Sequence, residues 1–364
     1  MPRARDLGLR IGVLPTGPTN SVLDVAGVGV GHATVHRDED PPPRGRGVAR
    51  TGVTAVVLAE DAYRRPVAAG GAVLNGAGEC TGFLSAREWG TAETPVWLTS
   101  TMQLGRVYDA ACEIALEGDA GVADDVVIPV VAECDDSFLN DCRRMQVTAD
   151  DVRAAYDAAL ASRGSSAPPA EGAVGAGTGM SCFELKGGIG TASRVVPGGG
   201  AGGYTVGVLL LTNFGTRDQA VVAGVPVGRL LLPAAGPGPA RPAGSCIGLV
   251  VTDAPVDGHG CERLARRVGL GLARAGSVAH HGSGEIFLGF GTGRRHDRDI
   301  SPEAGPPVLS GRALDPLFAA VVEAAEEAVL NSMFCAPATT GRDGNTSPSL
   351  HSPEVLDLLA GVRS

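Results

Sequence analysis

The residues best suited to chemistry surround Ser245, which follows a loop rich in proline and glycine and begins an apolar segment. If the bond between Gly244 and Ser245 is hydrolysed, Ser245 gains a free α-amino group beside its own hydroxyl. An α-amine titrates near pH ~7.7–8.0, so it can accept a proton at neutral pH. A hydroxyl nucleophile that uses its own N-terminal amine as the base is a known catalytic arrangement. The junction therefore predicts a cleavage site and a nucleophile at the head of a buried strand.

Asn213 is the candidate to stabilise an oxyanion. Attack on an amide carbonyl develops negative charge, and one preorganised donor is worth roughly 10²–10³ in rate. Asn213 ends the apolar run 206–212, so its amide can turn from a strand end into a cleft. The alternative interpretation is an ordinary turn-forming asparagine after a strand.

Ser283 and Glu285 are spaced two residues apart, which places them on one face if the segment is a strand. The carboxylate can then orient the Ser283 hydroxyl or a Ser245 ammonium. The alternative is a solvent-facing strand edge. The neighbouring His280 and His281 would face opposite ways in an extended chain, so we interpret both as packing or surface groups.

Three glycine clusters lie at 27–31, 175–179 and 187–190. None has the pattern of a phosphate-binding or dinucleotide-binding loop, so nucleotide binding is not expected. We interpret them as tight turns beside a cleft. The cluster at 175–179 can also present backbone N–H groups to a substrate carbonyl.

The elements that must position these residues follow from apolar patterning. Runs of strand length cover 28–35, 53–59, 126–132, 205–212, 246–252 and 285–290. Helical patterns cover 104–117, 148–163, 257–274 and 313–334, with a short final helix entered at Ser352-Pro353. Loops are expected at 41–47, 162–172 and 232–244. Interleaved strands and helices predict a layered α/β or α+β domain with helices covering the sheet faces.

Composition excludes several classes of function. The 364 residues carry a net charge of −10 and show no basic cluster beside aromatic residues, so a nucleic-acid partner is not expected. No apolar stretch approaches the ~18 residues of a membrane span, and no signal peptide is visible, so we predict a cytoplasmic protein without membrane contact. The eight cysteines are scattered without a C-x-x-C pair, which favours reduced thiols over disulfides or structural zinc.

Together, ten segments give the chain a resemblance to a known family. It resembles the DmpA-type aminopeptidases, which include the L-aminopeptidase/D-esterases and the β-peptidyl aminopeptidases. The segments occur in order along nearly the whole chain, at 25–32, 50–54, 73–82, 175–180, 186–194, 213–215, 244–245, 252–255, 283–285 and 340–344.

This resemblance implies an α+β fold, a four-layer αββα sandwich like that of the N-terminal nucleophile hydrolases, but with the connectivity of DmpA and the ornithine acetyltransferases. It implies a single catalytic domain, 1–364, that cleaves itself into an α-chain 1–244 and a β-chain 245–364. Ser245 would be the nucleophile, Asn213 would stabilise the oxyanion, and Ser283 and Glu285 would assist. Members form oligomers of the αβ unit and use neither a metal nor an organic cofactor.

One segment departs from the family pattern. Members often carry aromatic groups near 132–141, where this chain matches at Glu133 and at 139–141 but has no tyrosine. Phe138 is expected only to line the pocket wall. Glu133 and Asp135 are candidates to hold the ammonium group of a substrate.

The sequence therefore predicts a self-processing serine aminopeptidase or amidase. It would hydrolyse N-terminal residues of short peptides, amides or esters through an acyl-enzyme on Ser245. Three alternatives stay open at this point. They are an amidase like the nylon-oligomer hydrolases, which use threonine; an acyltransferase like the ornithine acetyltransferases; and an uncleaved, non-catalytic binding protein.

Overall fold

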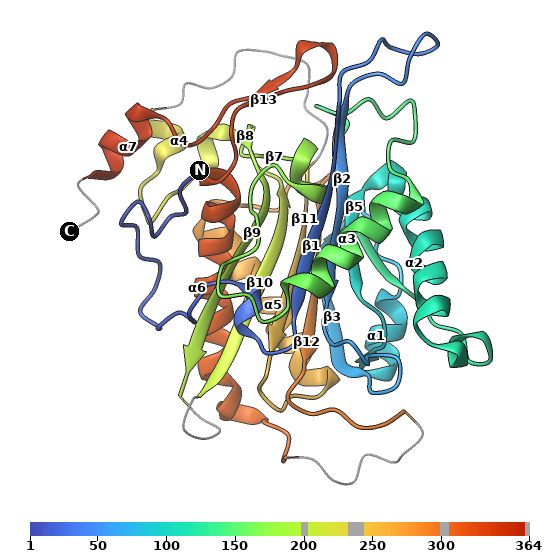
Figure 1. The fold of residues 1–364 in the computed structure, drawn as a ribbon. Coiled ribbons are helices and arrows are strands. Elements are labelled where there is room, and N and C mark those ends of the chain that lie inside the picture. The colour runs from blue at the N-terminus through green and yellow to red at the C-terminus, as the bar shows by residue number, and fades with distance from the viewer. Residues whose placement is uncertain (198–202, 232–243, 299–305, 361–364) are drawn as a thin grey trace.

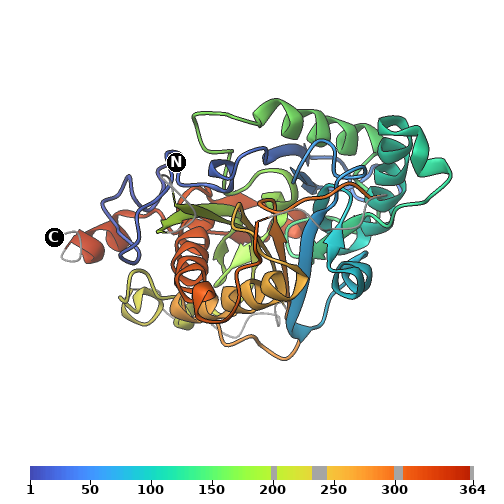
Figure 2. The ribbon, with the colours of Figure 1, turned by 90° about the horizontal axis from the view of Figure 1, so that it is seen from below.

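Four layers build the molecule, seen from two directions in Figures 1 and 2. The structure is a computed structural model and describes residues 1–197, 203–231, 244–298 and 306–360. Helices α5 (Gly258–Arg274) and α6 (Asp315–Phe334) cover a six-stranded sheet, and α2 (Leu104–Gly118) and α3 (Ala149–Ser162) cover a four-stranded sheet. The two sheets face each other, which confirms the predicted αββα sandwich of the α+β class.

The six-stranded sheet has the order β4-β3-β12-β11-β10-β9, and the four-stranded sheet has the order β1-β2-β5-β6. The strands of the larger sheet are β3 (Val67–Gly76), β4 (Thr91–Ala92), β9 (Gly188–Val196), β10 (Tyr204–Asn213), β11 (Ser245–Thr252) and β12 (Gly284–Gly291). Those of the smaller sheet are β1 (Gly29–Arg37), β2 (Ala49–Val57), β5 (Val96–Ser100) and β6 (Val130–Cys134). Short elements complete the described chain: α1 (Phe83–Trp89), β7 (Ser181–Cys182), β8 (Leu185–Lys186), α4 (Val227–Leu230), β13 (Thr339–Thr340), β14 (Thr346–Ser347) and α7 (Pro353–Leu359).

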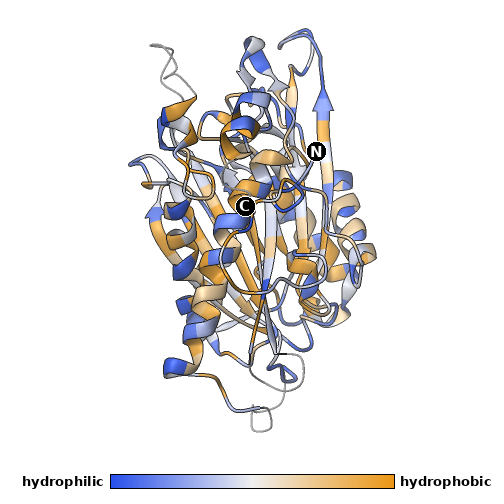
Figure 3. Ribbon diagram, turned by 90° about the vertical axis from the view of Figure 1, so that its left-hand side faces the viewer, coloured by the Kyte–Doolittle hydropathy of each residue, from blue (hydrophilic) through white to orange (hydrophobic). Residues whose placement is uncertain are grey.

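Three apolar cores fill the three spaces between layers. One joins α5 and α6 to the six-stranded sheet, the second lies between the sheets, and the third packs α2 and α3 on the smaller sheet. Figure 3 shows the hydrophobic colour concentrated in the interior strands. Apolar burial of this extent is the main favourable term in folding, and it holds strand β11 rigidly at the centre of the larger sheet.

The helices were predicted more accurately than the strands. All five helical patterns are helices, and Thr148 and Asp151 form the capping box that their spacing predicts. Four of the six predicted strands match closely, whereas 53–59 overlaps β2 only up to Val57 and the run 126–132 becomes extended only at Val130. Strands β3, β5 and β9 were not predicted. The expected loop at 41–47 contains neither helix nor strand. The one at 162–172 begins at the last residue of α3 and ends at Gly172, which forms an isolated bridge with Ile189. Of the one at 232–244, only Gly244 lies within the described residues.

Two of the glycine clusters were interpreted wrongly as turns. Gly29 and Gly31 lie in β1, where a Cβ atom would approach the Ala159 and Ala155 carbonyl oxygens of α3 to 2.0 and 2.2 Å. Gly190 lies in β9, where a Cβ atom would meet the Ala328 carbonyl oxygen of α6 at 1.9 Å. Glycine is needed at these positions because the helices pack directly on the strand backbone. Of the first cluster, Gly27 does lie in a turn, with φ 84°, and 175–179 is a turn, a short 3₁₀ helix.

Two features bear on membranes and redox state. No helix within the described ranges has the length and apolarity of a membrane-spanning segment. All eight cysteines are described, and each is a free thiol.

Candidate active site

Ser245 opens strand β11 between two partners at one end of the larger sheet. It lies opposite Asn213, the last residue of antiparallel β10, and opposite Gly284, the first residue of parallel β12. Ser245 and Asn213 are only 5% and 7% exposed. The fold thus brings the predicted nucleophile and the predicted oxyanion donor to adjacent strand ends.

The backbone holds the bond before Ser245 in a fixed place. The Gly284 N–H donates a hydrogen bond to the Gly244 carbonyl oxygen at 3.2 Å. A Cβ atom on Gly244 would lie 2.1 Å from the Asn213 carbonyl oxygen and 2.7 Å from the Phe214 Cα atom. Only glycine fits before Ser245 without moving the β10 backbone.

Ser283 and Glu285 form the pair that their spacing predicts. The Ser283 hydroxyl donates a short hydrogen bond to Glu285 Oε1, and both residues are buried. Burial raises the pKa of Glu285, against the lowering effects of the Ser283 hydroxyl, its own backbone, the His280 charge and the Asn75 amide. Glu285 Oε2 is buried and has no hydrogen-bond partner in the described structure. This oxygen can accept a hydrogen bond from a nearby donor, such as the α-ammonium group that Ser245 would gain if the chain were cut before it.

The Asn213 amide is fixed by two contacts. Its Oδ1 atom accepts a hydrogen bond from the Ser181 N–H at 2.8 Å, and its Nδ2 atom donates to the Asp135 carbonyl oxygen at 2.8 Å. An amide nitrogen carries two hydrogens, so one N–H of Asn213 is left to face a reacting carbonyl.

Lys186 supports this amide from behind and was not recognised as a site residue in the sequence. Its side chain is fully buried, and Nζ donates to the carbonyl oxygens of Gly177, Met180 and Gly187 at 2.7 to 2.9 Å. The Met180 carbonyl and the Ser181 N–H belong to one peptide group. Lys186 therefore holds the peptide that holds Asn213. The signals in the sequence were that Lys186 is the single lysine of the chain and that it begins the segment 186–194 of the family resemblance.

A cavity of about 190 Å³ opens beside these residues. It is lined by Asp135, Phe138, Ser181, Glu184, Asn213, Phe214, Gly215, Thr216, Gly244 and His280. Phe138 thus lines the wall as predicted, and Asp135 lies in the same cavity. His280, interpreted from the sequence as a packing or surface residue, also lines it.

Glu133 lies on the neighbouring sheet, outside this cavity wall. It accepts hydrogen bonds from the Glu79 N–H at 2.8 Å and from the Thr101 hydroxyl. Burial raises its pKa, and these two donors lower it in part. A Cβ atom on Gly78 would lie 3.2 Å from Glu133 Oε1 and 3.8 Å from the Gly284 Cα atom, so the carboxylate reaches the end of β12 near Ser245.

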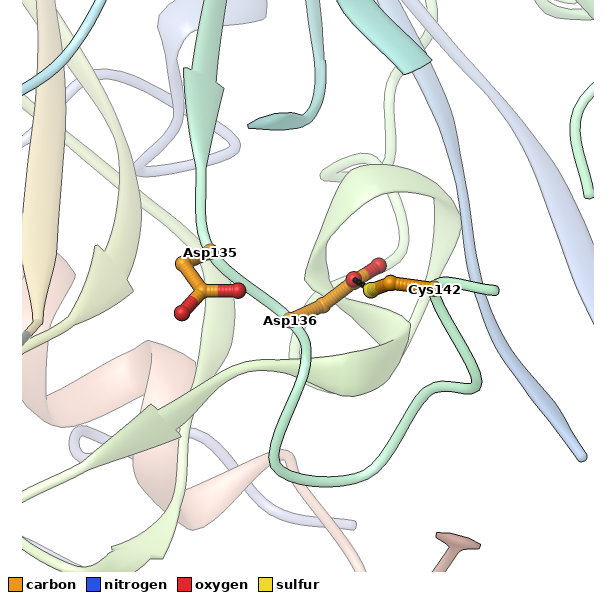
Figure 4. A group of neighbouring side chains, drawn as sticks. All are labelled: Asp135, Asp136 and Cys142. Atoms are coloured by element: carbon orange, nitrogen blue, oxygen red, sulfur yellow. Dashed lines mark hydrogen bonds between the residues drawn. The ribbon is translucent and has the colours of Figure 1, made fainter. Parts of the chain in front are cut away.

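Asp135, which lines the cavity, is grouped with Asp136 and Cys142 (Figure 4), with ligand atoms within 4.8 Å of one another. Burial raises the pKa of Asp136 to about 6. Burial and the Asp136 charge raise the pKa of the Cys142 thiol, which donates to Asp136 Oδ1 at 3.5 Å. A thiol kept protonated is a poor metal ligand, so we interpret the group as the hydrogen-bonded anchor of the loop that carries Phe138.

The turn at 175–179 does not present its first N–H groups to a substrate, contrary to expectation. The N–H groups of Gly175 and Ala176 donate to the hydroxyls of Thr34 and Thr54, and that of Gly177 donates to the Val174 carbonyl. These three donors are already used within the protein.

Comparisons with known proteins agree with this geometry. The model of peptidase family S58 matches residues 20–347. A curated relative, "Beta-peptidyl aminopeptidase BapA" of Sphingosinicella microcystinivorans, is 39% identical over 376 residues, which cover 100% of this chain and 93% of the relative.

Solved structures are equally similar. The L-aminopeptidase D-Ala-esterase/amidase of Ochrobactrum anthropi, described as a variant of the Ntn hydrolase fold, has a TM-score of 0.89 at 36% identity, covering 100% of this chain and 99% of that one. The PH0078 protein of Pyrococcus horikoshii has a TM-score of 0.90 at 39% identity, covering 99% of both chains. The fold, the site geometry and these matches lead to one conclusion: the chain belongs to peptidase family S58, the DmpA-type aminopeptidases, and is a hydrolase.

Proposed function

We propose that this aminopeptidase cleaves itself between Gly244 and Ser245 and then uses Ser245 to remove N-terminal residues from short peptides and amides. The observation that carries the proposal is the position of that bond. Its carbonyl is held by the Gly284 N–H, and its serine lies opposite the Asn213 amide.

In self-cleavage, Ser245 Oγ attacks the Gly244 carbonyl carbon, the C–N bond breaks, and the acyl group moves to oxygen as an ester. Water then hydrolyses the ester, leaving a Gly244 carboxylate and a Ser245 α-amine. In turnover, this amine takes the Oγ proton as Oγ attacks the substrate carbonyl. The departing amine receives that proton, and water releases the acyl group.

The neighbouring residues act on charge and orientation. The second N–H of Asn213 would donate to the oxyanion. Glu285 Oε2, buried without a partner in the described structure, would accept from the Ser245 ammonium, and Ser283 would link the two. Because a base must be unprotonated, kcat/KM should fall below pH ~7.7 as the α-amine gains a proton.

The site that would bind the acyl group of a substrate favours a particular kind of residue. In the uncut chain, Gly244 occupies this site. Gly244 has an unsubstituted CH₂ next to its carbonyl, and an L side chain there would collide with the Asn213 backbone. A β-residue also has a CH₂ next to its carbonyl when it is unsubstituted at that carbon. We therefore propose β-residues at the substrate N-terminus, with the ammonium held by Glu133 or Asp135.

The Ser245→Ala variant tests the processing step. We expect one uncut chain without activity, where the wild type gives two fragments on a denaturing gel and an N-terminus at Ser245 by mass spectrometry. Ser165→Ala, at an exposed loop serine, is the matched control and should cut normally. A cut or active Ser245→Ala protein would refute the proposal.

Substrate preference is tested separately with anilides of β-homoalanine and L-alanine. The enclosed Gly244 position predicts a kcat/KM at least about tenfold higher for the β-residue, corresponding to roughly 1.4 kcal/mol in the transition state. Equal rates, or faster cleavage of L-alanine anilide, would show that the acyl site rearranges after processing. Assembly of αβ units into oligomers stays a prediction, which light scattering can measure.

A further inference from the structure

Asn75 lies near the end of β3, on the strand next to the one that carries Glu285. It is directly opposite Glu285 in the antiparallel ladder, while Ile286 pairs with Val73, so the register shifts at this point and Leu74 has no partner on β12. Residues directly opposite each other in such a ladder share a face of the sheet. A bulge of this kind re-aims a side chain and is frequent beside active sites.

The Asn75 amide holds the turn that leads into Ser283. Its Nδ2 atom donates to the His280 carbonyl oxygen at 2.7 Å and lies 3.4 Å from the His281 carbonyl oxygen. The Ser283 N–H donates to the same His280 carbonyl at 2.8 Å. The His280 carbonyl oxygen thus accepts hydrogen bonds from both the Asn75 side chain and the Ser283 backbone, and these bonds fix the position of Ser283.

Asn75 also lies opposite Glu285 in the ladder. Asn75 is one of the groups that offset the burial-driven rise in the pKa of Glu285, with Ser283 and the charge of His280. The buried thiols of Cys134 and Cys246 are the other titratable groups close to Glu285. Asn75 therefore lies beside both members of the Ser283–Glu285 pair, because it holds the turn before Ser283 and is opposite Glu285 in the ladder.

We propose that Asn75 is a positioning residue, which holds Ser283 and Glu285 in the arrangement that Ser245 requires. It touches no substrate atom and acts through the His280–Ser283 turn. This inference rests on the proposed function, because it assigns Asn75 to the same reaction.

The test uses the full-length protein with Asn75→Ala and the isosteric Asn75→Asp. Loss of the donor should slow self-cleavage and lower kcat by about 10–100-fold with little change in KM, since small displacements of a catalytic group have effects of this size. In both variants the acid limb of the kcat/KM profile should move to higher pH. The Ala variant removes the positive end of a donor dipole and the Asp variant adds a negative charge, so both changes favour the charged Ser245 α-amine and raise the pKa that sets this limb. Asn75→Gln, which keeps the donor, should recover part of the rate.

Leu74→Ala, at a 58% exposed neighbouring position, is the control and should behave as wild type. Active-site titration corrects every rate for the fraction of folded enzyme, and Asn75→Asp gives the result if Asn75→Ala does not fold. A kcat within about twofold of wild type, or a loss without any shift of the pH profile, would overturn the inference. An uncut and inactive wild type would instead overturn the proposed function itself, so the two failures are distinguishable.

Discussion

Two fully buried cations, Arg194 and Lys186, lie in opposite electrostatic surroundings. Arg194 in β9 pairs with Glu323 at 3.0 Å and with Glu327 at 2.7 Å, both on α6. Glu327 also accepts from Arg5 at 2.8 Å and from Asn20 at 2.6 Å. Lys186 is surrounded by three carbonyl oxygens, and none of the ion pairs between described residues includes it.

This difference between ion pairs around Arg194 and carbonyl oxygens around Lys186 corresponds to where the two residues lie in the chain and the fold. The Arg194 cluster joins residues of the segment 1–244 to α6, which belongs to the segment 245–364. If the chain is cut at Gly244, these ion pairs become contacts between two fragments. The Lys186 side chain and the three carbonyls that its Nζ atom contacts belong to the first segment and lie directly behind Asn213. The ion pairs of Arg194 thus connect the two segments. Lys186, which forms no ion pair with a described residue, supports the candidate site.

The largest effect is expected from Arg194→Met. Removing the guanidinium takes away the cation that Glu323 and Glu327 share, and breaking a buried pair costs about 3–5 kcal/mol. We expect this loss in the free energy of unfolding, measured by urea titration in the Ser245→Ala background, where one chain should unfold.

The matched control is Arg153→Met, which breaks a surface pair between Arg153 and Glu117. Surface pairs contribute about 0–1 kcal/mol, so this variant should unfold near the parent midpoint. Equal losses in the two variants would show that the buried cluster is no more important than a surface pair.

The sequence predicted much of this framework, because periodicity reports burial directly. The strands 205–212, 246–252 and 285–290 and all the helices around them were correct. Strands β3 and β9 were missed because glycine replaces the apolar residues that mark a strand. Gly190, for example, is required by the contact with Ala328, which depends on a helix more than a hundred residues away.

The candidate site divides in the same way. Ser245, Asn213, Ser283 and Glu285 could be named from the sequence because each combines a suitable residue type with a strand end or a two-residue spacing. Lys186 and Asn75 could not, because their partners are backbone carbonyls brought near by folding. Every residue has a backbone carbonyl, so no residue type or spacing in the sequence marks such a contact.

Lys186→Met gives a smaller effect than Arg194→Met at neutral pH and sharpens the comparison most. Burial lowers the pKa of Lys186 from 10.5 to about 7, so between these values the folded chain holds fewer protons than the unfolded chain. Lys186 therefore makes stability rise as pH increases from about 7 towards 10.5, and below pH 7 the full cost of a buried ammonium is present. Methionine removes this titration and takes one donor from each of three carbonyls, of which those of Gly177 and Met180 keep a backbone donor. We expect its destabilisation relative to the parent to be small at about pH 6.5 and larger at about pH 9.5, whereas that of Arg194→Met should be constant because arginine does not titrate in this range.

Urea titrations of both variants at the two pH values measure these differences in the free energy of unfolding. A constant difference for Lys186→Met would mean that the three carbonyls keep Lys186 charged throughout, and the contrast between the two cations would then lie in their position alone.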